Sequence, residues 1–397
     1  MISEYKLDKS DFTNELRMLL EILSMDVDPI AGTNAQKLSK DIDWQRFLEL
    51  TLHHRVYPII YTRLNSMNQL PIPKDVMDAL QEAYKKNTYQ MMKLTAEMGR
   101  VCNLFAENDV RSIVLKGPVV AEALYGDLSM RTSKDLDILV SLEDVELVER
   151  ILIDQGYHFE NSFIKKLKEW RVASHLVFNH PKLGVQIEIH WIMHSIMEEE
   201  PSFLELWDRS RKSSLSDGSV YYLGEDDLFI YLVNHGAKHA WFRLRWLVDI
   251  KMMLLKMDDW KSIEKFLIKY KYMNVATQAL ILACQMLSAP LSDEMRQLKV
   301  TKHIRLLTQG AVFFICDESD VHSIRTPRYV RRNLQKYQNL MRTNRQRILL
   351  FVGIFTPKSV DAQLLPLPKP LHFLYYPLRP FLWAIRKVSK IRQGASN

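Results

Sequence analysis

The sequence predicts an α+β protein in which a small mixed sheet lies between helical regions. Apolar residues recur at three- and four-residue steps in the first quarter of the chain and again beyond about residue 216, which is typical of helices. Between these regions, short runs rich in β-branched residues alternate with helical segments. We therefore expect an N-terminal helical region (1–98), a central core (99–215), a C-terminal helical region (216–325) and a basic, proline-punctuated tail (326–397).

The N-terminal region is expected to be a helical scaffold. The apolar pattern of residues 12–23 continues through 43–64, and residues 74–109 are predicted to form one or two long helices. For His53 and His54, which lie in this scaffold, packing is a better prediction than metal binding.

The central core begins with an apolar strand at 111–117 that ends in glycine. Pro118 fits the first position of a helix over 118–126, because a missing N–H costs nothing there. The second half of 129–140 alternates as a strand.

A further helix is expected from Ser141 to Gly156, opened by a capping box of Ser141 and Asp144. Strands at 174–179 and 185–191 flank the turn HPKLG and predict a hairpin. Beyond it, residues 225–257 are predicted to form two helices that break near Trp241.

The segment KDLDILV carries the main chemical signal. Alternate side chains of a strand share a face, so Asp135 and Asp137 point the same way. Two adjacent carboxylates repel each other unless a cation lies between them, and hard oxygen ligands suit Mg²⁺ or Mn²⁺. Two solvated aspartates on an exposed strand are the alternative, and a bare D-x-D pattern does not exclude it.

Two neighbouring motifs favour the metal interpretation. Gly117 allows the backbone to approach a ligand before a helix N-terminus, and Lys116 could add a positive charge for phosphate. In QIEIH (186–190), Glu188 lies between two apolar isoleucines and is a candidate third metal ligand. Two metal ions bridged by such carboxylates stabilise both the attacking and the leaving oxygen of an in-line displacement.

This order of motifs resembles the nucleotidyltransferase superfamily typified by DNA polymerase beta. More narrowly, the chain resembles a little-characterised bacterial nucleotidyltransferase family. The resemblance covers about residues 40–255 and rests on DWQRFLELTLHHRVYPII, VLKGPVVAEALYGDLSMRTSKDLDILV, VQIEIHW and HGAKHAWFRLRWLVDI.

The resemblance implies that residues 99–215 form a nucleotidyltransferase catalytic core in which Asp135, Asp137 and Glu188 bind metal and carry catalysis. It also implies that the nucleotide-binding residues are Lys116, Gly117 and Arg131. The superfamily usually has Gly-Ser or Gly-Gly at the glycine turn, whereas this chain has Lys-Gly-Pro. That departure leaves the pose of the triphosphate open.

Three histidines are candidates for acceptor binding, namely His190, His235 and His239. The last two lie four residues apart and share a helix face, so a zinc site is an alternative, although the H-E-x-x-H motif is absent. Arg243 and Arg245 follow near the helix break, where they could face a cleft.

Charge is unevenly distributed along the chain. From residue 328 onward there are 14 Lys/Arg and one acidic residue, a net charge of +13, whereas the remainder carries −6. Such a tail attracts polyanions, and its aromatic and apolar runs fit either a membrane surface or a segment wrapped over the helical body. No nucleic-acid-binding motif accompanies the charge.

The chain shows no signal-peptide pattern and no apolar run near 20 residues, and its three cysteines form no framework. We expect a cytoplasmic protein, peripheral at most to the inner face of the membrane. The expected reaction moves a nucleoside monophosphate from a nucleoside triphosphate to an unidentified acceptor hydroxyl or phosphate, with Mg²⁺ or Mn²⁺. The alternative is a non-catalytic nucleotide-binding or scaffold protein of a membrane-linked biosynthetic complex.

Overall fold

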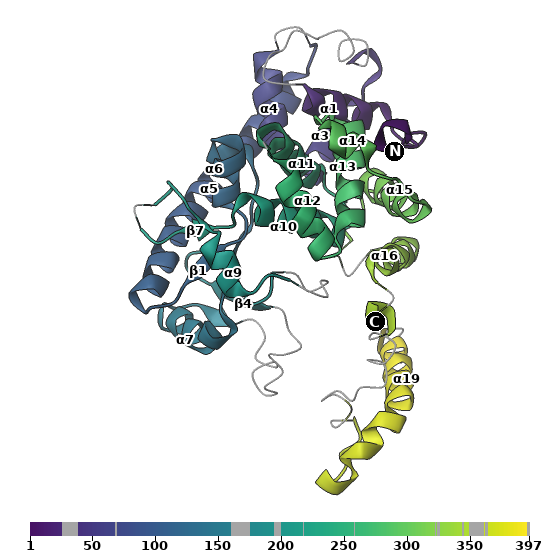
Figure 1. Cartoon of the computed structure of the whole chain (residues 1–397). Helices are drawn as coiled ribbons and strands as arrows, with labels where there is room; N and C mark the ends of the chain where they lie inside the picture. Colours follow the sequence, from purple (N-terminus) through teal and green to yellow (C-terminus); the bar gives the residue numbers. More distant parts are fainter. Residues whose placement is uncertain are drawn as a thin grey trace.

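The computed structural model is an α+β protein whose sheet lies against helices drawn from both flanking regions (Figure 1). It describes residues 1–25, 39–67, 70–159, 175–193, 200–216, 218–257, 259–321, 323, 326–343, 345–348, 361 and 364–394. Within these residues, seven strands form one mixed sheet in the order β3-β4-β5-β2-β1-β7-β6. Their bounds are β1 Ser112–Val114, β2 Asp135–Val140, β3 His158–Phe159, β4 His175–His180, β5 Val185–His190, β6 Arg211–Lys212 and β7 Tyr221–Tyr222.

The helices before the sheet form the expected scaffold. They are α1 Asn14–Ser24, α3 Trp44–His53, α4 Tyr57–Ser66 and α5 Lys74–Glu107. The α5 helix is a single helix of 34 residues that contacts β1 and β2, and its apolar face is buried. Because α5 continues without a break across residues 98 and 99, the boundary placed there stays a prediction.

The acidic residues lie on two interior strands of the sheet, and the strand with the two aspartates makes two different kinds of pairing. The β2 strand pairs antiparallel with β1 on one side and parallel with β5 on the other. The β4–β5 hairpin is confirmed, with Gly184 at φ 57° in its turn. In the parallel pair, Asp137 is the register partner of Glu188, which a hairpin prediction alone could not give.

The connection from β1 to the next helix is built as the sequence indicated. Gly117 has φ 87° and precedes α6 Pro118–Tyr125, in which Pro118 takes the first position. The later helix is shorter than expected, because η4 Leu142–Asp144 precedes α7 Val145–Asp154. The predicted capping box is wrong, since neither Ser141 nor Asp144 makes a side-chain cap.

The helical region after the sheet packs on α1 and the sheet. The expected break near Trp241 is confirmed, with Ala240 and Trp241 at positive φ between the first two helices. The helices of this region are α10 Glu225–Lys238, α11 Leu244–Lys256, α12 Trp260–Lys269, α13 Met273–Leu287, α14 Asp293–Gln297, α15 Lys302–Cys316 and α16 Arg328–Met341. A further short helix, α9 Phe203–Asp208, lies between β5 and β6 in the chain.

The end of the chain forms a short 3₁₀ helix, η6 Lys369–Leu374, followed by α19 Tyr375–Gly394. The α19 helix extends away from the rest of the described structure (Figure 1). It is anchored locally, since buried Arg379 pairs with buried Asp361 at 2.9 Å. Within the described residues, no helix has the length and apolar character needed to cross a bilayer.

Candidate active site

The three predicted acidic residues come together at the adjoining strands β2 and β5. Asp135 and Asp137 share one face of β2, and the parallel register places Glu188 beside Asp137. Asp137 is buried, whereas the side chain of Asp135 is 24 % exposed. We call Asp135, Asp137 and Glu188 the acidic centre.

Lys116 lies between the two aspartates. Its Nζ is 2.6 Å from Asp135 Oδ1 and also contacts Asp137 Oδ2 as an ion pair. Burial alone would lower the pKa of Lys116, but the charges of Asp137 and Asp135 outweigh it and raise that pKa. The amine is therefore a fixed cation at the point where the carboxylates converge.

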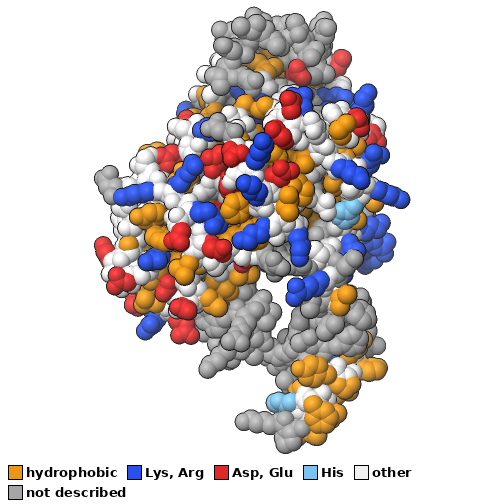
Figure 2. Space-filling model, viewed as in Figure 1, with side chains coloured by type: hydrophobic (Ala, Val, Ile, Leu, Met, Phe, Trp, Pro, Cys, Tyr) orange, Lys and Arg blue, Asp and Glu red, His pale blue; other side chains and the backbone are white. Residues whose placement is uncertain are grey.

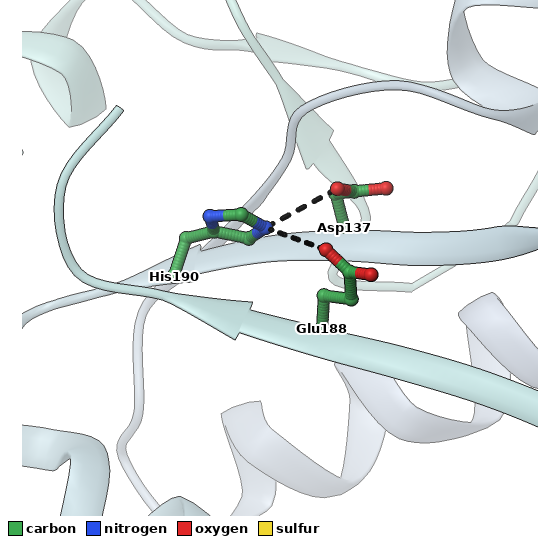
Figure 3. Close-up of side chains that lie close together, drawn as sticks. All are labelled: Asp137, Glu188 and His190. Carbon is green, nitrogen blue, oxygen red and sulfur yellow. Dashed lines mark hydrogen bonds and ion pairs between the residues drawn. The ribbon is translucent and has the colours of Figure 1, made fainter. Parts of the chain in front are cut away.

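His190 joins the acidic centre from the end of β5 (Figure 3). Its Nε2 lies 3.2 Å from Asp137 Oδ1 and 3.5 Å from Glu188 Oε2. One potential ligand atom from each of these three residues lies within 4.8 Å of the others. His190, expected as a candidate for acceptor binding or proton transfer, thus contacts both Asp137 and Glu188.

Electrostatics around His190 match this contact geometry. Burial opposes its charged form, but hydrogen bonds to Asp137 and Glu188 outweigh burial and raise the pKa of His190. Burial likewise opposes ionisation of Asp137, yet Lys116 and His190 hold its pKa below the usual range. Lys116 and His190 therefore offset part of the negative charge of the acidic centre.

A cavity of about 280 Å³ opens over the acidic centre and is closed on the other side by α10. Asn234 and Lys238 line it beside the two predicted histidines. Burial lowers the pKa of Lys238, opposed by the charges of Glu188 and Asp137. The Oδ1 of Asn234 is buried and has no hydrogen-bond partner among the described residues. These polar groups face the place where a substrate would lie over the carboxylates.

His235 and His239 both line the cavity, with their ring centroids 4.8 Å apart. Burial and the neighbouring His239 hold the pKa of His235 well below its ordinary value. Neither residue belongs to the cluster of possible metal ligands formed within the described part of the chain. The geometry therefore favours contact with a substrate over the zinc site considered from their spacing.

Arg131 does not line the cavity over the acidic centre. It is 3 % exposed, and its Nε and Nη2 donate to Asp249 of α11 at 3.0 Å each. Tyr125 donates to the same carboxylate at 2.8 Å. Arg131 is absent from the cavity lining, so the structure gives no geometric support to a direct phosphate contact. It joins the sheet region to α11 and positions the segment before β2.

Sequence reasoning missed several polar residues of this site. Asn234 and Lys238 both lie on α10 and line the cavity. Their i, i+4 spacing, which puts them on one face of the helix, is the only sequence signal that they share. His175 stacks on His190 with ring centroids 5.0 Å apart, but it comes from β4, whose pairing with β5 fixes that contact. Asp249 lacks any local signal, because its partner is 118 residues away.

One family model matches this chain. The model of a family described as uncharacterised nucleotidyltransferase matches residues 40–288, which include the acidic centre, the Lys-Gly turn and α10. Searches of curated proteins and of solved structures found no match. Because the family model covers more than half of the chain, the protein belongs to this uncharacterised nucleotidyltransferase family.

Proposed function

We propose that the protein transfers a nucleoside monophosphate from a nucleoside triphosphate to an acceptor hydroxyl or phosphate. The acceptor oxygen forms a bond to the α-phosphorus while the bond to pyrophosphate breaks, and the acceptor proton passes to a carboxylate. The observation that carries the proposal is the parallel pairing of β2 and β5, which sets Asp137 beside Glu188 under a polar cavity.

The donor set fits a divalent cation. Carboxylate oxygens suit Mg²⁺ and Mn²⁺, and the imidazole of His190 adds a nitrogen that favours Mn²⁺. Asp137, Glu188 and His190 would hold the ion, with Asp135 available beside them. Lys116 already places a positive charge between Asp135 and Asp137, so the acidic centre is built to stabilise a cation. When bound, the ion would neutralise phosphate charge and polarise a reacting oxygen.

The protein's own residues would divide the remaining tasks. Lys116 and the backbone at Gly117, which precedes α6, are placed for phosphate oxygens. Glu188 is the candidate that accepts the acceptor proton. His235 and Lys238 line the opposite wall, where they would contact the acceptor.

The test is calorimetric titration with each of the four nucleoside triphosphates, with and without Mg²⁺ or Mn²⁺, combined with an assay of pyrophosphate release. Asp137→Asn should reduce transfer about 1,000-fold, because several kcal/mol of stabilisation of the transition state would be lost. The matched control is Asp154→Asn, which changes an exposed side chain at the end of α7 and should leave transfer unchanged. Wild-type transfer rates in Asp137→Asn would refute the proposal.

The scaffold alternative makes a different prediction in the same titration. A non-catalytic protein would bind nucleotide without releasing pyrophosphate under any metal. A zinc hydrolase would instead retain one zinc ion per chain after dialysis and lose it in His235→Phe. Neither alternative accounts for the contact of Lys116 with both aspartates.

We also propose that the tail contacts an anionic membrane surface. Phe381 and Phe373 are 67 % and 63 % exposed, and Figure 2 shows apolar side chains gathered on this projecting segment. The net charge of +13 from residue 328 onward would favour acidic lipids. The protein should co-sediment with vesicles containing phosphatidylserine but not with pure phosphatidylcholine vesicles, and Phe373→Ser/Phe381→Ser should weaken that binding. Equal recovery with both vesicles would contradict it.

A further inference from the structure

Three segments that are far apart in sequence meet beside the first residue of β2. The turn between α3 and α4 is held to the start of α11, because Arg245 N donates to His54 O at 3.3 Å. Arg245 Nη1 in turn donates to Thr132 O at 2.6 Å. The next two residues after Thr132 lead directly to Asp135, so this junction adjoins the acidic centre.

Each of the three segments contributes a cation. Arg55 comes from the turn, Lys134 from the residue before β2, and Arg243 and Arg245 from the start of α11. We call these four residues the cation cluster. Among the described residues, their ion pairing is limited to a 3.9 Å contact between Arg243 and Asp320, whose side chain is 51 % exposed.

The cations of this cluster repel one another. Burial lowers the pKa of Arg243 to about 10, and the charge of Arg55 acts in the same direction. Asp135 offsets part of this repulsion, but it is already paired with Lys116. The cluster is therefore short of negative charge.

Backbone and side-chain donors at the junction add to this imbalance. Helices α4 and α11 both begin here. His54 already accepts from the first two N–H groups of α11, those of Leu244 and Arg245, whereas the N-cap residue of α4 makes no side-chain cap. Helix N-termini carry partial positive charge and attract anions. The Nε of Arg245 is buried and has no acceptor among the described residues. A bound anion would satisfy both the charge and the donors.

We propose that the cation cluster binds phosphate oxygens of a substrate beside Asp135. The proposal rests on the proposed function, because the shared residue Asp135 places the bound phosphate next to the acidic centre. Guanidinium groups bind phosphate through paired hydrogen bonds, and Arg55 and Arg243 would supply them. The phosphate belongs either to the β- and γ-positions of the nucleotide or to the acceptor.

The experiment uses the full chain and inorganic tripolyphosphate in the absence of divalent metal. Arg55→Gln/Lys134→Gln should raise the Kd for tripolyphosphate at least about tenfold, since two charge-assisted contacts are lost. Neither of these side chains makes a hydrogen bond within the described part of the chain, so the variant should fold, which its melting temperature checks. The matched control is Lys212→Gln on β6, an exposed lysine that should leave the Kd unchanged.

A second titration identifies the source of the phosphate. If tripolyphosphate binding is unchanged in the variant while inorganic phosphate binds more weakly in the presence of saturating nucleoside triphosphate, the cluster holds the acceptor's phosphate. If neither ligand is affected, or if the wild type binds neither, the proposal is overturned. Because tripolyphosphate binding is measured without metal, it does not depend on Asp137. A failure of the proposed nucleotidyl transfer can therefore be told apart from a failure of the cation cluster to bind phosphate.

Discussion

The two sides of Asp135 differ in how their charges are compensated. On one side, Lys116 and His190 offset much of the charge of the acidic centre from within the protein, with Lys116 Nζ 2.6 Å from Asp135 Oδ1 and His190 Nε2 3.2 Å from Asp137 Oδ1. On the other, the cation cluster has one long ion pair, with Asp320, among the residues described. A compensated cluster supports the fold before any ligand arrives, whereas an uncompensated one is destabilising until an anion binds. The comparison therefore distinguishes charges that are paired within the protein, in the acidic centre, from charges that we propose to be paired by a substrate, in the cation cluster.

The largest expected effect concerns a fully compensated pair, Arg131 and Asp249. Arg131→Met leaves a buried carboxylate without its partner and should cost about 3–5 kcal/mol of unfolding free energy. Denaturant unfolding measures the loss, and Arg131→Met/Asp249→Leu should recover most of it. The control is Lys86→Met, which breaks an exposed pair with Glu82 and should leave the unfolding free energy nearly unchanged. Equal losses of unfolding free energy in Arg131→Met and Lys86→Met would show that burial does not determine how much an ion pair stabilises this protein.

His54 and His235 should make the stability of the protein depend on pH. Burial holds the pKa values of His54 and His235 well below 6.5, so both are neutral in the folded state but protonate in the unfolded chain. Their contribution to stability is present above pH 6.5 and is lost as pH falls towards the folded values. At pH 5.5 we expect a loss of about 2–3 kcal/mol from the pair.

Unfolding curves collected between pH 7.5 and 5.5 test this expectation. His235→Phe keeps a ring of similar size between Tyr231 and Trp246 and should reduce the slope. Part of the slope should remain, because burial also lowers the pKa of His53, to about 4. A slope that does not change in the variant would mean that other groups carry the proton linkage.

The glycine turn between the two charge regions should have a smaller effect. Gly117→Ala places a side chain at φ 87°, although its Cβ would have room at 3.6 Å from Ser133 Oγ. The strain should cost about 1–2 kcal/mol. The matched control is Gly99→Ala inside α5, where helical backbone suits alanine and stability should hold or rise. Thermal denaturation of both variants distinguishes backbone strain from a general cost of filling space.

The smallest expected change tests how strongly Lys116 compensates the negative charge of the acidic centre. Lys116→Met removes a cation from the acidic centre, so Mn²⁺ should bind about tenfold more tightly in the absence of nucleotide. Calorimetry measures this affinity, and Lys116→Arg should keep the wild-type value because it keeps the charge. Unchanged affinity in Lys116→Met would mean that the lysine and the metal occupy separate places.

Local sequence patterns determined much of the architecture. The alternation in KDLDILV predicted β2 and the shared face of its aspartates, and Gly117-Pro118 predicted the entry to α6. Helical periodicity predicted the flanking regions and the break near Trp241. These features depend on residues close together in the chain, so the sequence contains their causes.

Tertiary structure decided which of those residues meet. The parallel register of β5 on β2 brought His190 to Asp137, and the ion pair with Asp249 drew Arg131 away from the cavity. Arg55 and Arg243 meet beside Asp135 only because the turn after α3 is bonded to the start of α11. Such contacts join residues more than 50 positions apart, and their energies depend on burial and charge partners that no local pattern contains.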